Sequence, residues 1–152
     1  MGLNEEVEIL RNISLFAKIE PSKLKLLAFA SDRVVFAPGQ ELFHQGDSGD
    51  TAYIILSGEA DILIDGANGP IKVASVGKSS IVGEIAILCD VPRTATVKAT
   101  DAESLITLAI AKDLFFDMVC EYPQMAIEIM RELASRLEKT TNKLRDALAA
   151  AG

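Results

Sequence analysis

The chain is poor in the residues that most metalloenzymes and hydrolases use at their active sites. Its 152 residues include one histidine, His44, and two cysteines, Cys89 and Cys120, with no metal-type spacing. A structural or catalytic metal site needs several converging ligands. A Ser/His/Asp set would have to use His44, which has no nucleophile signature beside it, and no Walker-type phosphate loop is present. The sequence therefore predicts that the protein has no metal site, no catalytic residue and no enzyme activity. It also predicts that the two thiols are reduced and partly buried.

Long apolar runs and an excess of basic residues are also missing. No run approaches the roughly 20 residues that a membrane helix needs, and the acidic N-terminus does not resemble a secretory signal. Gly2 lacks the Ser or Thr of a myristoylation motif. We therefore expect a cytoplasmic protein that does not associate with membranes. The net charge of −7 disfavours non-specific nucleic-acid binding, which depends on basic surface, so any anion site must be local.

The residue pattern predicts one domain, residues 1–152, with helices at both ends and short strands between them. A helical lead-in covers residues 3–32, with apolar spacing in its first helix and Pro21 opening its second. Short alternating segments separated by Gly and Pro turns fill residues 33–110, a pattern typical of an antiparallel sandwich or barrel. Two helices follow over residues 111–149. The predicted class is mainly β with flanking helices.

The most informative stretch is residues 81–97, which places two charges beside a glycine turn. Gly83 allows close backbone approach and a positive φ, and free amides follow it at the start of a short helical turn. Arg93 supplies a planar, permanently charged group suited to phosphate. Glu84 can accept hydrogen bonds from a hydroxyl. Together these groups suggest a ligand with both a phosphate and a vicinal hydroxyl, such as a nucleotide sugar.

This stretch resembles the phosphate-binding cassette of cyclic-nucleotide-binding domains, F-G-E-x-A-L-x-x-x-x-P-R-x-A-T-V. The residues that match as they stand are Gly83, Glu84, Ala86, Pro92, Arg93, Ala95, Thr96 and Val97. Val82 replaces the usual aromatic residue, which alters packing around the sugar and base. The run from Pro38 to Ala60 also matches the family, with Gly46, Gly49 and Gly58 at corners of the fold. The resemblance covers about Leu10 to Leu137 and implies an antiparallel β jelly roll (double-stranded β-helix).

The resemblance also implies roles for individual residues. Glu84 would accept a hydrogen bond from the ribose 2′-hydroxyl, while Arg93 and nearby amides would hold the cyclic phosphate. Thr94 permits cGMP without deciding the base, and we favour cAMP. The expected ligand-binding residues are Val82, Gly83, Glu84, Ile85, Ala86, Arg93, Thr94 and Ala95. Two other roles for Glu84 are a helix cap and, without ligand, an ion pair with Arg93.

The last helix, from Pro123-Gln124 and about Met125 to Leu148, carries a second pattern. Its apolar positions are spaced alternately three and four residues apart, as in a heptad seam; they are Ile127, Met130, Ala134, Leu137, Thr141, Leu144 and Leu148, with Thr141 an interruption. Three interpretations remain open. The helix forms a parallel homodimer, which we favour; it supplies a lid over the base from Met130, Leu133 or Leu137; or its first half packs on the barrel and the rest is a solvated tail.

The function that the resemblance implies is a cyclic-nucleotide receptor, with cAMP or cGMP as ligand and no catalytic cofactor. Ligand would reposition the C-terminal helices about a hinge near residues 111–113 or 122–123, and so signal to a protein partner or an attached domain. Since the chain ends at Gly152 without room for a helix-turn-helix, we expect no direct nucleic-acid binding. The alternatives are an interaction module with a degenerate pocket, the sensor fragment of a larger transcription factor, kinase or channel, and a jelly-roll enzyme.

Overall fold

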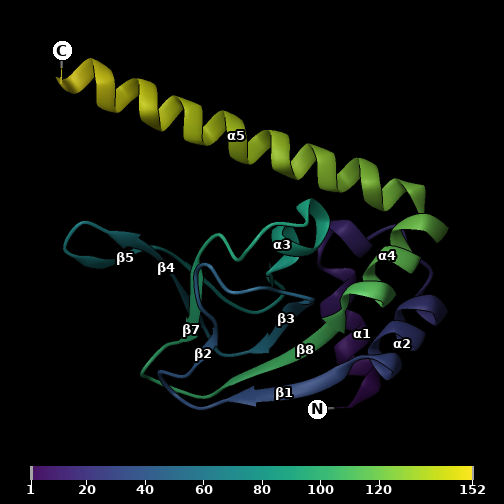
Figure 1. Cartoon of the computed structure of the whole chain (residues 1–152). Coiled ribbons are helices and arrows are strands. Elements are labelled where there is room, and N and C mark those ends of the chain that lie inside the picture. Colours follow the sequence, from purple (N-terminus) through teal and green to yellow (C-terminus); the bar gives the residue numbers. More distant parts are fainter. Residues whose placement is uncertain (1, 152) are drawn as a thin grey trace.

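The computed structural model, which describes residues 2–151, places two four-stranded antiparallel sheets beside a group of helices (Figure 1). The strands are β1 (Asp32–Phe36), β2 (Glu41–Phe43), β3 (Thr51–Ser57), β4 (Ala60–Gly66), β5 (Gly69–Val76), β6 (Ile81–Val82), β7 (Thr96–Ala99) and β8 (Leu105–Ala111). The helices are α1 (Leu3–Arg11), the 3-10 turn η1 (Ser14–Phe16), α2 (Pro21–Ala30), α3 (Glu84–Cys89), α4 (Lys112–Glu121) and α5 (Pro123–Ala151).

One sheet has the strand order β1-β8-β3-β6 and the other the order β2-β7-β4-β5. Neighbours in each sheet are antiparallel, and non-consecutive strands pair, so the chain passes repeatedly between the two sheets. The predicted mainly β architecture with helices at both ends is confirmed. Among the described residues, no helix combines the length and apolar character that crossing a membrane requires.

Strand β3 divides its side chains between two apolar cores. Ala52, Ile54 and Leu56 point toward α1, α2, α4 and the start of α5, where they join the larger cluster. Ile55 points to the opposite face and joins the smaller cluster between the sheets. This division follows from the two-residue period of a strand. Because both faces of β3 are buried, the strand is apolar almost throughout, and it fixes the sheet against the helices.

The β4–β5 hairpin has a tight turn, because its ladder continues to the pair Gly66↔Gly69. Cys89 and Cys120 are exposed free thiols rather than partly buried ones, because each lies in the last turn of a short helix. The long helix α5 is anchored by Met125 and Ile129 in its first turns.

Candidate functional site

Gly83 connects β6 to α3 with a backbone conformation that other residues rarely adopt. Its φ is 84°, in the left-handed region, as the sequence predicted. A Cβ atom at this position would lie 2.5 Å from Nη1 of Arg93 and 3.2 Å from the carbonyl oxygen of Thr51. Glycine is therefore required twice, for the turn itself and for the space that the arginine side chain occupies.

The guanidinium of Arg93 is buried beside this turn. Its Nη1 donates to the carbonyl of Gly83 at 3.0 Å, and its Nη2 donates to the carbonyl of Thr51 at 2.8 Å. The group stacks on the Phe43 ring at 4.1 Å from the centroid, while Nε has no hydrogen-bond partner among the described residues. Burial lowers the pKa of Arg93, yet an arginine keeps its charge at neutral pH. Unused donors and a buried positive charge favour binding of an anion.

The main chain of Arg93 is held by the loop between β2 and β3. Gly46 donates its amide to the carbonyl of Arg93 at 2.9 Å, and the amide of Arg93 donates to the carbonyl of Asp47 at 2.8 Å. Gly49 lies against the guanidinium, where a Cβ atom would overlap Nε. Sequence reasoning placed Gly46 and Gly49 at corners of the fold, but did not anticipate that this loop positions the arginine.

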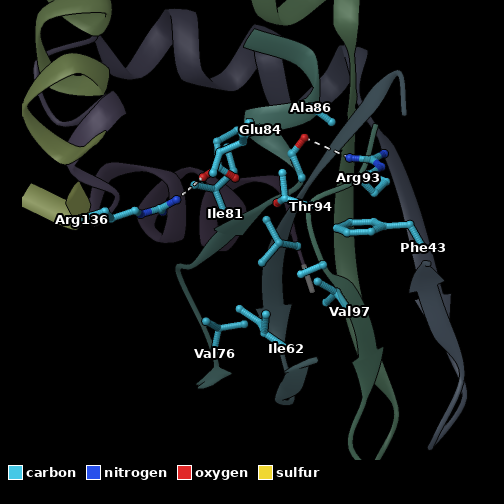
Figure 2. Close-up of a pocket in the computed structure, with 14 residues that line it drawn as sticks. Phe43, Ile62, Val76, Ile81, Glu84, Ala86, Arg93, Thr94, Val97 and Arg136 are labelled. Atoms are coloured by element: carbon cyan, nitrogen blue, oxygen red, sulfur yellow. Dashed lines mark hydrogen bonds and ion pairs between the residues drawn. The ribbon is translucent and has the colours of Figure 1, made fainter. Parts of the chain in front are cut away.

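Glu84, the first residue of α3, has a buried carboxylate that pairs with Arg136 of α5. Nη1 of Arg136 lies 3.0 Å from Oε1 of Glu84 (Figure 2). Burial raises the pKa of Glu84, and the charge and hydrogen bond of Arg136 partly offset this rise. The ion pair of Glu84 with Arg93 that we considered from the sequence is not formed, because Arg93 directs both Nη atoms to backbone carbonyls.

These groups open onto one cavity of about 190 Å³. The residues that line it are Phe43, Ile62, Val76, Ile81, Val82, Gly83, Glu84, Ile85, Ala86, Arg93, Thr94, Ala95, Val97 and Arg136. All eight expected ligand-binding residues are among them. The charged groups lie toward α3, while Ile62, Val76 and Val97 form an apolar wall from β4, β5 and β7 (Figure 2). The cavity therefore offers a cation, a carboxylate acceptor and an apolar surface to one ligand.

The three residues considered for a lid lie outside this lining. Met130 and Leu137 are exposed by 61% and 68%, and Leu133 packs on the larger core cluster. The residue of α5 that reaches the cavity is Arg136. The sequence did not indicate it, because an apolar side chain was expected to cover the base. The signal was available in Glu84, since a buried carboxylate requires a positive partner or several hydrogen bonds.

Within residues 2–151, the structure brings together no group of three or more His, Cys, Asp or Glu side chains that could hold a metal ion. The imidazole of His44 instead lies beside the carboxylate of Glu41, with Nδ1 3.2 Å from both oxygens.

Comparisons with known proteins identify the family to which this site belongs. The model of the cyclic nucleotide-binding domain matches residues 33–122, more than half of the chain. A CRP-like cAMP-activated global transcriptional regulator of Mycobacterium tuberculosis is 30% identical over 93% of this chain and 62% of its own length. The acetyltransferase Pat of Mycolicibacterium smegmatis is 37% identical over 82% of this chain and 37% of its own length. The chain thus spans less than two thirds of these curated relatives.

A solved structure supports the same relationship. The catabolite activator protein of Thermus thermophilus superposes with a TM-score of 0.79 at 26% identity, over 89% of this chain and 62% of that one. The predicted jelly-roll fold is confirmed by this similarity and by the two-sheet topology.

Proposed function

Because this chain belongs to the cyclic nucleotide-binding domain family, we propose that it is a receptor for a cyclic nucleotide, with cAMP favoured and cGMP permitted. One observation supports this most directly. A buried arginine with unused donors and a buried carboxylate open onto the same cavity beside an apolar wall. A cyclic phosphate, a ribose hydroxyl and a base match these three features.

In this proposal the cyclic phosphate binds Arg93, and the ribose 2′-hydroxyl donates to Glu84. The base lies against the apolar wall, which includes Ile62 and Val76. The residues expected to contact ligand are those that we named from the cassette, with Arg136 added. The chain itself is proposed to be non-catalytic, although relatives such as the acetyltransferase carry an enzyme name.

The response to ligand is proposed to pass through α5. Since Arg136 pairs with Glu84, a ribose hydroxyl that binds Glu84 must share this carboxylate with the helix. Ligand binding then changes the free energy of the observed α5 position relative to alternative positions of this helix. A ligand shifts such an equilibrium only by its difference in affinity for the two states. The hinges proposed from the sequence, near residues 111–113 and 122–123, coincide with the starts of α4 and α5.

A second proposal is that α5 forms a parallel homodimer. Four residues of the predicted seam are each exposed by more than half: Met130, Leu137, Leu144 and Leu148. Buried seams of this spacing stabilise paired helices.

The signal would pass to a protein partner or to an attached domain. Among the relatives, the mycobacterial regulator is described as cAMP-activated.

Calorimetric titration with cAMP and, separately, cGMP tests the receptor proposal. The wild type should bind at least one nucleotide at micromolar concentration or tighter, and Arg93→Ala should abolish binding. Arg131→Ala is the matched control, because Arg131 is exposed on α5 and pairs with Glu128. Thermal unfolding must show that Arg93→Ala remains folded, and Glu84→Gln offers a second, less disruptive variant. Failure of folded, ligand-free wild type to bind either nucleotide would overturn the proposal and favour the degenerate interaction module.

A further inference from the structure

The guanidinium of Arg93 is a buried charge whose hydrogen bonds are incomplete. Nη1 and Nη2 donate to the carbonyls of Gly83 and Thr51 at 3.0 Å and 2.8 Å, while Nε has no hydrogen-bond partner among the described residues. Only 5% of the residue is exposed, and burial lowers its pKa. Burying a charge without its full set of hydrogen bonds is costly, so any further contact that stabilises this charge favours the observed orientation.

The ring of Phe43 provides such a contact. Cζ of Arg93 lies 4.1 Å from the centroid of the ring, and Figure 2 shows the two side chains beside each other. The negative face of an aromatic ring attracts a cation at this distance, and more strongly where water is excluded. Phe43 is also the only aromatic residue among the described residues that line the cavity. The ring therefore stabilises the charge of Arg93 beside the space that an anion would enter.

The position of Phe43 is fixed by contacts that do not involve Arg93. Phe43 is the last residue of β2 and lies opposite Val97 of β7, where the register of the two strands shifts. Tyr53 of β3 stacks with the ring, with 6.2 Å between centroids and 28° between planes. Phe36 of β1 contacts Tyr53 edge-on, with 5.7 Å between centroids. Since β2 and β3 belong to different sheets, residues of both sheets hold the ring, and the ring can restrain the guanidinium.

We propose that Phe43 is a positioning residue for the phosphate site, whose ring keeps the guanidinium of Arg93 in the orientation that binds the anion. The inference rests on the proposed function for its effect on nucleotide affinity, but not for its effect on Arg93. Without the negative face of the ring, the guanidinium exchanges its backbone contacts for water in a fraction of the unliganded molecules. The observed dissociation constant rises as the fraction of molecules in the binding orientation falls.

Fluorination of the ring tests the electrostatic contact while keeping the side chain in place. Trifluorophenylalanine at position 43, fluorinated at the far edge of the ring, preserves the shape of the side chain but removes most of the negative potential of its face. The same amino acid at position 36 is the matched control. Phe36 is buried in the same aromatic group and lies outside the lining of the cavity. Thermal unfolding checks that both variants are folded.

The proton NMR signal of the Arg93 Nε–H group, measured on the unliganded full chain, reports whether the guanidinium stays over the ring. A proton near the face of an aromatic ring is shifted upfield, and a fluorinated ring retains this effect. The signal should therefore move downfield in the position-43 variant, as the guanidinium leaves the ring, and should not move in the position-36 variant. Phe43→Leu, which has no ring, provides the reference for complete loss of the shift. An unchanged Arg93 signal in the position-43 variant would overturn the inference.

Titration with cAMP, or with cGMP if the wild type binds only cGMP, is the second measurement. Affinity should fall by roughly 2- to 5-fold with trifluorophenylalanine at position 43 and should be unchanged with the same amino acid at position 36. A loss of affinity in Phe43→Leu but not in the fluorinated variant would show that the ring contacts the ligand directly, and would overturn the inference. If the wild type binds neither nucleotide, the proposed function fails, and the Arg93 signal alone then decides whether Phe43 positions the arginine.

Discussion

Oε1 of Glu84 and Nη1 of Arg136 lie 3.0 Å apart although the two residues are separated by 52 positions in the chain. The pair joins the first residue of α3 to the middle of α5 across the cavity (Figure 2). A carboxylate with 8% of its side chain exposed thus has a partner that is 45% exposed. Because the partner is accessible to solvent, the guanidinium of Arg136 can be hydrated when the pair is broken.

Arg136→Met should raise the pKa of Glu84 further above its ordinary value. Burial already raises this pKa, and Arg136 is the main side chain that opposes the rise. A carboxyl group whose folded-state pKa exceeds its unfolded-state value destabilises the fold as pH rises from the lower to the higher value. The variant should therefore lose more stability over this range than the wild type. Carbon-13 NMR titration of the Glu carboxyls measures the pKa, and Arg131→Met, which breaks an exposed pair with Glu128, should leave Glu84 unchanged.

Gly83→Ala should destabilise the protein more than Gly69→Ala. Both glycines have positive φ, 84° and 117°, but a Cβ atom at Gly69 meets no neighbour within 4 Å. Gly69→Ala therefore reports backbone strain, about 1–2 kcal/mol. Gly83→Ala adds the overlap with Arg93 and should also weaken cAMP binding. Urea unfolding and calorimetric titration measure the two effects; equal stability losses in the two variants would contradict the role assigned to Arg93 packing.

Glu41→Gln should lower the pKa of His44. The hydrogen bond and the charge of Glu41 are the largest causes that raise this pKa, with smaller contributions from Asp47 and Asp65. The raised value means that protonated His44 stabilises the folded state below its unfolded-state pKa, and that this contribution disappears as pH rises through the folded-state pKa. His44 is the single histidine, so one imidazole signal in a proton NMR titration reports it. An unchanged midpoint in Glu41→Gln would show that the pair is absent in solution.

Leu137→Asp combined with Leu144→Asp should convert the proposed dimer to a monomer. Both leucines are exposed on α5, by 68% and 59%, and a carboxylate within a paired apolar seam is strongly unfavourable. Analytical ultracentrifugation measures the change. Ser135→Asp places the same charge on another face of the helix and should leave the dimer intact. A wild type that sediments as a monomer at all concentrations, with and without cAMP, would exclude the seam as a dimer interface.

Thr94→Ala should reduce affinity for cGMP while leaving affinity for cAMP nearly unchanged. Thr94 is exposed and lies in the lining of the cavity, and the family resemblance implies that a Thr or Ser after the arginine can hydrogen-bond the guanine of cGMP. A single hydrogen bond of this kind contributes about 0.5–1.5 kcal/mol, or up to roughly tenfold in the dissociation constant. Parallel titrations with the two nucleotides measure the ratio. Equal losses for both would assign Thr94 to the phosphate rather than to the base.

The sequence predicted the parts of this site that depend on local backbone geometry. The positive φ of Gly83 and the short helix after it follow from residues adjacent in the chain, so a motif is sufficient to place them. The contacts of Arg93 with Thr51 and of Gln45 with Asp65 depend on how distant loops meet. No local pattern encodes such contacts, because they arise from the register of strands in two sheets.

Arg136 illustrates a different limit. The heptad pattern of α5 grouped Met130 and Leu137 in one apolar seam, and both side chains are exposed in the structure. It could not indicate where the helix crosses the β-roll. The position of the crossing is set by Met125 and Ile129, which pack on the larger core. This packing brings Arg136 to Glu84. The need of a buried carboxylate for a positively charged partner would have been a better guide than apolar spacing to the residue of α5 that reaches the cavity.

The length of α5 beyond the site has a mechanical consequence. A helix rises about 1.5 Å per residue, so Arg136 lies about 20 Å from the start of α5 at Pro123 and Ala151 about 42 Å from it. If the helix pivots as a rigid rod at its anchored end, any displacement at Arg136 is about doubled at Ala151. An ångström-scale displacement of Arg136, which would let a ribose hydroxyl bind Glu84, would thus become a larger displacement at the distal end of α5. Any protein surface that contacts this end would experience the larger displacement.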